Sequence, residues 1–226
     1  MGMPVSQYVR AVAAAMVTVL AACQSTPVSH RVEIGPLPVA IGPSDSAAIA
    51  RARADSVRHP YTQADIDFMS HMVSHHAQAV AMARLAPTHG ASPAVQRLAE
   101  RIINAQQDEI VTMQRWLADR RQPIPEPDPT GMRMTMGGAE HRMLMPGMLT
   151  AAQMQELDAA RGAEFDRVFL TYMIQHHKGA VTMVKDLFAS YGAGQDELVF
   201  KFASDVNVDQ TTEIARMEHM LASLTS

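Results

Sequence analysis

Two pairs of adjacent histidines are the residues of this chain best suited to chemistry. His75 and His76 form the first pair, and His176 and His177 form the second pair 101 positions later. Imidazole nitrogens bind transition metals, and they also build buried hydrogen-bonded networks. A single histidine on an apolar face usually belongs to such a network. Two pairs in matching surroundings favour a metal site, because a network of buried imidazoles is costly if any nitrogen lacks a partner.

The neighbours of the histidine pairs are repeated too. Met72 and Met82 flank the first pair, and Met173 and Met183 flank the second at the same spacing. A further set recurs at an offset of 104 positions, where Gln106, Glu109, Ile110 and Met113 match Gln210, Glu213, Ile214 and Met217. A helical period places the histidines, the methionines before them and both glutamates on core-facing positions. The candidate metal ligands are His75, His76, His176, His177, Met72, Met173, Met82, Met183, Glu109 and Glu213.

The donor types indicate which metal such a site would hold. Imidazole combined with thioether suits copper, because methionine favours Cu(I) and histidine accommodates Cu(II). Zinc is an alternative that would use the histidines and glutamates alone. A di-iron site is disfavoured because the chain lacks the Glu-x-x-His pattern of such helices. Histidine ligands must be neutral, so affinity is expected to weaken as pH falls through about 6 to 7.

A second group of soft donors lies between the two repeats. Six of the 18 methionines fall there with one histidine: Met132, Met134, Met136, His141, Met143, Met145 and Met148. Thioethers in a glycine- and proline-rich segment could form a secondary loop that binds soft metal ions. The alternative is a loop that packs over one end of the helices. The sequence leaves both interpretations open.

The elements that position these residues are predicted to be helices. One covers residues 62–86, and a second runs from Ser92 and Pro93 to about residue 121. A third begins at the capping pattern of Thr150 and Gln153 and continues through the second histidine pair to about residue 190. A fourth covers about residues 195–223, and no segment shows the alternation of a strand. The predicted fold is all-α, an antiparallel four-helix bundle made of two repeated helical hairpins.

The amino-terminal part is predicted to serve export. Residues 1–23 resemble a lipoprotein-type signal peptide, with one arginine, an apolar run and a single cysteine, Cys23, as the lipidation position. Residues 24–60 form a Pro/Ser-rich flexible tether. The helical domain follows at 61–226, with repeat one at 61–121, a Met/Pro-rich connection at 122–149 and repeat two at 150–226. The protein is therefore expected to be a membrane-anchored lipoprotein facing the periplasm or the cell exterior.

Overall charge disfavours one class of partner. The net charge is −4 and the isoelectric point is near 6.2, without a cluster of lysine and arginine. Nucleic acid is therefore not an expected partner. Metal ions are, and a homodimer and other metal-handling proteins of the cell envelope stay open.

The pattern Phe-x-x-x-Met-x-x-His-His occurs in both copies, and Met-Pro-Gly-Met-Leu-Thr (Met145 to Thr150) precedes the second one. In these features the chain resembles the bacterial domain-of-unknown-function family 305 over about residues 61–224. The resemblance implies a ferritin-like four-helix bundle, usually exported, with copper binding or copper tolerance suggested for some members and no established enzymatic activity. It carries over to six positions: His75, His76, His176, His177, Met72 and Met173. His71 departs from the pattern because Tyr172 is its counterpart.

Three functions are compatible with these features. The first is an extracytoplasmic metal-binding protein, most simply for copper binding, buffering or tolerance at the cell envelope. The second is a metal-dependent oxidase on the same helical scaffold. The third is a lipid-anchored structural or interaction module in which the histidines only hold helices in register.

Overall fold

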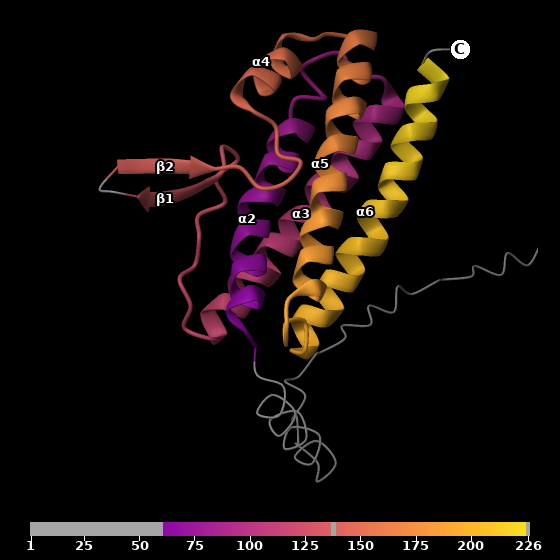
Figure 1. Ribbon diagram of the computed structural model, residues 1–226. Helices are drawn as coiled ribbons and strands as arrows, with labels where there is room; N and C mark the ends of the chain where they lie inside the picture. The colour runs from indigo at the N-terminus through magenta and orange to yellow at the C-terminus, as the bar shows by residue number, and fades with distance from the viewer. Residues whose placement is uncertain (1–60, 137–138, 225–226) are drawn as a thin grey trace, which may run out of the picture. The chain divides into compact units, whose positions relative to one another are not determined.

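The computed structural model describes residues 61–136 and 139–224 of the chain (Figure 1). The elements are α2 (Gln63–Ala83), α3 (Pro93–Asp119), β1 (Met132–Met136), β2 (Ala139–Met143), α4 (Ala151–Ala159), α5 (Ala163–Ala189) and α6 (Glu197–Leu224). The fold is mostly helical, which confirms the all-α class. The signal peptide, Cys23 and the tether lie outside the described residues. Within those residues, no helix is both long and apolar enough to cross a membrane.

Three helices begin at the capping residues that the sequence indicates. The Thr62 side chain accepts a hydrogen bond from the Asp65 N–H, and the Asp65 carboxylate accepts one from the Thr62 N–H. The hydroxyl of Ser92 caps α3 ahead of the proline at its first turn. Thr150 and Gln153 form the same reciprocal arrangement at α4. These bonds satisfy N–H groups that have no partner within the helix, and so they fix where each helix starts.

The third predicted helix is wrong as a continuous element. It is split into α4 and α5 at residues 160–162, where Ala160 is extended and Gly162 has a φ of 58°. The Gly162 N–H donates to the carbonyl oxygen of His89 at 2.8 Å, which ties this break to the turn after α2. A left-handed glycine breaks the helical run, and neither the apolar periodicity nor the capping pattern signals it.

The connection between the repeats contains a hairpin that the sequence analysis did not predict. Strands β1 and β2 are antiparallel, with Met132 opposite Met143 and Met134 opposite His141. The sequence Gly137-Gly138 separates two short alternating runs, which is a known signal for a two-residue hairpin turn. This turn signal lies inside the segment that the sequence analysis assigns to the Met/Pro-rich connection.

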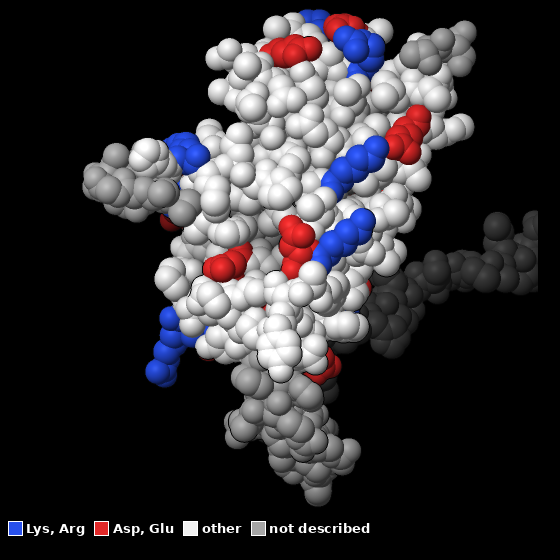
Figure 2. All heavy atoms as spheres, in the orientation of Figure 1, with Lys and Arg blue, Asp and Glu red and all other residues white. Residues whose placement is uncertain are grey.

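Helix packing joins the two hairpins of long helices. Helix α2 packs along α3, α5 packs along α6, and the two pairs meet where α2 contacts α5. The short helix α4 lies against α5. Acidic and basic side chains are interspersed on the face shown in Figure 2, and most of that face is uncharged.

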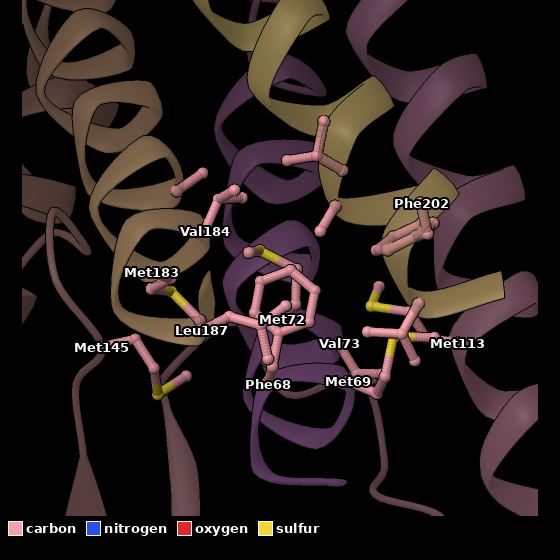
Figure 3. Packing of buried hydrophobic residues seen from close by; sticks show 14 of the residues in the cluster. Phe68, Met69, Met72, Val73, Met113, Met145, Met183, Val184, Leu187 and Phe202 are labelled. Atoms are coloured by element: carbon pink, nitrogen blue, oxygen red, sulfur yellow. The ribbon is translucent and has the colours of Figure 1, made fainter. Parts of the chain in front are cut away.

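The core is divided into two hydrophobic clusters. The first, here called the Phe68 cluster, contains Phe68, Met72, Met113, Met183 and Phe202 among others (Figure 3). The second, the Phe169 cluster, contains Met82, Leu98, Phe169, Met173 and Met217. On each of the four long helices, the residues between the two clusters include buried polar side chains. A polar layer therefore crosses the middle of the helical core.

Candidate metal centre

The polar layer is built from both repeats. Its central members are the four histidines, each with an exposed fraction of 0%. Helix α2 supplies His75 and His76, and α5 supplies His176 and His177. Helices α3 and α6 add a glutamine and a glutamate each: Gln106 and Glu109, and Gln210 and Glu213. The repeat detected in the sequence is thus a repeat of one structural unit around a shared layer.

The inner histidines of the two repeats touch. The ring centroids of His75 and His176 are 3.9 Å apart, with planes inclined at 38°. Within each pair the ring centroids are 6.3 Å apart. The structure therefore brings the predicted histidines together into one group.

Three of the histidines present one ring nitrogen to an oxygen acceptor. His75 Nε2 lies 3.0 Å from the carbonyl oxygen of Pro146. His177 Nε2 lies 2.8 Å from Glu213 Oε2, and His76 Nε2 lies 2.6 Å from Glu109 Oε2, although the latter contact lacks hydrogen-bond angles. Acceptors of this kind hold the proton on Nε2 and leave the lone pair on Nδ1. Histidines that bind metals usually have such a partner on the second nitrogen.

The remaining ring nitrogens have no hydrogen-bond partner among the described residues. Nδ1 of all four histidines is buried without a hydrogen bond of good geometry, and so is Nε2 of His176, although the backbone of His75 lies beside the His176 ring. A buried polar atom without a partner destabilises a folded protein by about 1–3 kcal/mol. A fully satisfied structural network would not leave these atoms alone, whereas a metal ion bound at Nδ1 would use them.

Burial keeps the inner histidines neutral. Desolvation, assisted by the nearby His76, lowers the pKa of His75 to about 3. Desolvation and then the neighbouring His75 lower the pKa of His176 well below its usual value. A neutral imidazole is the form that binds a metal. The expected weakening of affinity through pH 6 to 7 assumed an unperturbed imidazole, and for these two rings burial moves protonation below that range.

A tight backbone contact holds the acceptor for His75 in place. A Cβ atom on Gly179 would lie 1.9 Å from the Pro146 carbonyl oxygen, so only glycine allows the loop to sit against α5. The amide of Gln78 accepts from the Leu149 N–H at 2.6 Å and donates to the Leu149 carbonyl at 3.0 Å. The loop after β2 is thus held over the histidines by contacts with both α2 and α5.

The repeat-related methionines flank the layer. Met72 and Met183 lie in the Phe68 cluster, whereas Met82 and Met173 lie in the Phe169 cluster. Each cluster therefore receives one methionine from each copy. All four are buried, so their thioethers are shielded from water above and below the histidines.

The methionines of the connection have different environments. Met145 and Met148 are only 5% exposed and belong to the Phe68 cluster, and Met132 and Met143 pack against the same cluster. These four fit the interpretation of a loop packed over the helices. His141 is exposed and is paired in register with Met134. Nothing is described for the side chains of Met134 and Met136.

Within the described residues, no three side chains among His, Cys, Asp and Glu are arranged to hold one ion. The two glutamates contact the Nε2 atoms of His76 and His177, so their position suits partners of the histidines better than direct ligands. The half-buried His71 lies apart from the layer, on α2 beside two surface pockets.

Sequence reasoning assigned no role to Gln106, Gln210 and the Pro146 carbonyl. Both glutamines are buried in the layer, at 2% and 4% exposure. Their recurrence at the same offset as the glutamates was the signal that could have found them. The carbonyl of Pro146 could not have been found, because a backbone acceptor carries no signal in residue type.

Comparisons with known proteins give the relationship of the chain. Residues 65–221 match the family model described as domain of unknown function (DUF305). No curated protein matches the sequence. A DUF305 protein from Streptomyces coelicolor, named as a predicted secreted protein, is 31% identical over 72% of this chain and 94% of its own, with a TM-score of 0.60. A DUF305 fragment from Deinococcus radiodurans is 27% identical over 73% of this chain and 99% of its own, with a TM-score of 0.59.

A third similar structure is that of CopM in a Cu(I)-bound form. It is 26% identical over 72% of this chain and 98% of its own, with a TM-score of 0.54. The same protein has also been solved in Cu(II)-bound and Ag-bound forms. The family match covers well over half of the sequence and both histidine pairs, and this protein belongs to the DUF305 family.

Proposed function

We propose that this protein is an extracytoplasmic copper-binding protein whose four buried histidines hold the ion. The rings must move closer together on binding, because no three of the His, Cys, Asp and Glu side chains among the described residues are already placed around one position. The observation that carries the proposal is the set of unpartnered Nδ1 atoms in the polar layer. Three of the four rings also have the acceptor on Nε2 that an orienting partner would provide. The site is thus supplied with lone pairs that nothing else in the described residues uses.

Copper is the ion that this donor set suits best. The imidazoles lie between two methionine-bearing clusters, and thioether is a soft donor that favours Cu(I). Zinc would use histidine and carboxylate donors and not the thioethers, and the carboxylates here already contact histidine nitrogens. CopM, a relative by fold and sequence, binds Cu(I) and Cu(II). The corresponding role here is copper buffering or tolerance at the cell envelope, with attachment to a membrane through lipidated Cys23.

The hairpin β1–β2 is proposed as a secondary copper position. Its register places residues 134 and 141 opposite each other, next to residue 136 on the same strand. Met145 and Met148 are excluded from this position because they are buried in the Phe68 cluster. The secondary site is therefore narrowed to Met134, Met136 and His141, with Met132 and Met143 at its inner edge.

The test is a Cu(I) competition titration of residues 24–226 against a chromophoric chelator, with three matched proteins. In the first variant all four layer histidines are replaced by leucine. In the second, His89→Leu removes a buried histidine outside the layer, whose ring nitrogens contact Thr88 and Asp158. We expect the first variant to lose at least 100-fold in affinity and the second to match the wild type. Unchanged copper stoichiometry in the four-histidine variant would remove the core site and leave only the hairpin.

A further inference from the structure

A pocket opens between α3 and α6 beside the histidine layer. Its volume is about 380 Å³, and its lining includes Gln106, Glu109, Asp209, Gln210 and Glu213. Helix α3 contributes two of these side chains and α6 contributes the other three. The two glutamates therefore face both the histidines and this pocket.

The two glutamines leave buried polar atoms without partners at the wall of this pocket. Gln106 is 2% exposed, and neither atom of its side-chain amide has a hydrogen-bond partner among the described residues. The Oε1 atom of Gln210, which is 4% exposed, is also unpartnered. Buried amides are almost always hydrogen-bonded. Two that line one pocket with free oxygens indicate that a polar species belongs between them.

The charge of the pocket selects a cation. Glu109, Asp209 and Glu213 bring three carboxylates to its wall. The only basic side chain in the described lining is Arg101, which is 57% exposed and reaches Glu213 Oε1 at 3.9 Å. Asp209 has an alanine, Ala105, as its counterpart in the first repeat. The second repeat thus adds a negative charge at the pocket mouth that has no counterpart in the first repeat.

We infer that the α3–α6 pocket is a second cation site, in which carboxylate and amide oxygens hold a hydrated divalent ion next to the histidine layer. The oxygens act largely through the waters of the ion, because no three carboxylates among the described residues are spaced to bind one ion directly. Oxygen donors of this kind suit Mn²⁺, Mg²⁺ and Ca²⁺, and they do not suit Cu(I). A volume of about 380 Å³ accommodates an ion that keeps several waters. The site is chemically distinct from the histidine site and does not depend on copper binding there.

Each glutamate carboxylate has two oxygens, so one oxygen can contact a histidine of the layer while the other faces the α3–α6 pocket. Oε2 of Glu213 accepts from His177 Nε2, while its Oε1 faces Arg101 at the pocket. A cation in the pocket would draw on the second oxygen without breaking the histidine contact. The glutamate side chains thus connect the pocket to the histidine layer.

Mn(II) alone is the probe that tests the site. The electron paramagnetic resonance signal of free Mn(II) is followed during titration of residues 24–226 at fixed ionic strength. Four proteins are compared: the wild type, Gln106→Leu/Gln210→Leu, Asp209→Asn and the control Glu164→Gln. The control removes one exposed carboxylate on α5 that lies outside the pocket.

We expect saturable binding of one Mn(II) per chain in the wild type and the control, weakened at least 10-fold in both pocket variants. Binding that is equal in all four proteins, or that never saturates, would overturn the inference. If the double glutamine variant fails to show the wild-type circular dichroism spectrum, Asp209→Asn decides, because that side chain is exposed and cannot disturb the core. The Cu(I) titration reports the histidines separately, so either site can fail without the other.

Discussion

Replacing His176 by leucine should leave the stability of the copper-free protein nearly unchanged. Both ring nitrogens of His176 are buried, and neither makes a hydrogen bond of good geometry, although the backbone of His75 lies beside the ring. Leucine has a similar size and no polar atom, so the substitution removes the unsatisfied groups and keeps most of the volume. This outcome is unusual for a fully buried core position, where most substitutions destabilise.

The magnitude follows from two opposing effects. Removing an unpartnered buried polar group recovers about 1–3 kcal/mol. The different shape of leucine costs less than about 1.5 kcal/mol, and the ring contact with His75 at 3.9 Å adds about 0.5–1.5 kcal/mol to the loss. The losses together amount to about 0.5–3 kcal/mol and nearly offset the gain, so the free energy of unfolding should stay within about 2 kcal/mol of the wild-type value, with an expected change near zero.

The matched control is His89→Leu. His89 is also buried, but Thr88 Oγ1 contacts its Nδ1 at 2.9 Å and the Asp158 carbonyl contacts its Nε2 at 3.0 Å. Its replacement leaves partners unsatisfied and should destabilise by about 1–3 kcal/mol. Urea denaturation at pH 7.5 with a chelator measures both variants. If His176→Leu destabilises as much as His89→Leu, then His176 is hydrogen-bonded in solution and the layer is a structural network.

Three further outcomes follow from the same geometry. The contribution of His75 to the free energy of unfolding of the copper-free protein should be fully present above pH 6.5. It should fall by about 1.4 kcal/mol per pH unit as pH drops towards 3, because the unfolded chain takes up a proton that the buried ring cannot. Urea denaturation at pH 7.5, 6 and 5 checks this, and a free energy of unfolding that does not change with pH contradicts it. Gly179→Ala should destabilise by about 1–3 kcal/mol, because its Cβ would lie 1.9 Å from the Pro146 carbonyl oxygen and must displace the acceptor of His75. Thermal unfolding of this variant beside the wild type reports the effect, and an unchanged melting temperature would refute the close contact. Cu(I) at 100 times its dissociation constant should raise the free energy of unfolding by about 2.7 kcal/mol in the wild type and not in the four-histidine variant; an equal rise in both would place the ion elsewhere.

The sequence predicted the helices well where local chemistry determines them. The caps at Thr62, Ser92 and Thr150 are side-chain events within a few residues, and the structure has them as expected. The break before α5 was missed because it depends on Gly162 adopting a positive φ and donating to His89, which lies far away in the sequence. The hairpin β1–β2 was missed for another reason, because its two strands are only five residues long each and lie within a proline- and methionine-rich connection.

The candidate site was predictable in its residue types and not in its geometry. The repeat identified the histidines and glutamates, and the structure places all six in one layer. The sequence could not show that each glutamate contacts a histidine nitrogen. It also could not show that equivalent methionines of the two repeats lie in opposite hydrophobic clusters, because this arrangement follows from the antiparallel packing of the two repeats.

The most direct test of the account is X-ray absorption at the copper edge of residues 24–226 loaded with one equivalent of Cu(I). The account predicts a first shell that contains nitrogen, with the multiple scattering typical of imidazole, and the loss of that scattering in the four-histidine variant. A first shell of sulfur alone, unchanged in that variant, would show that the methionines bind the ion and that the buried histidines do not.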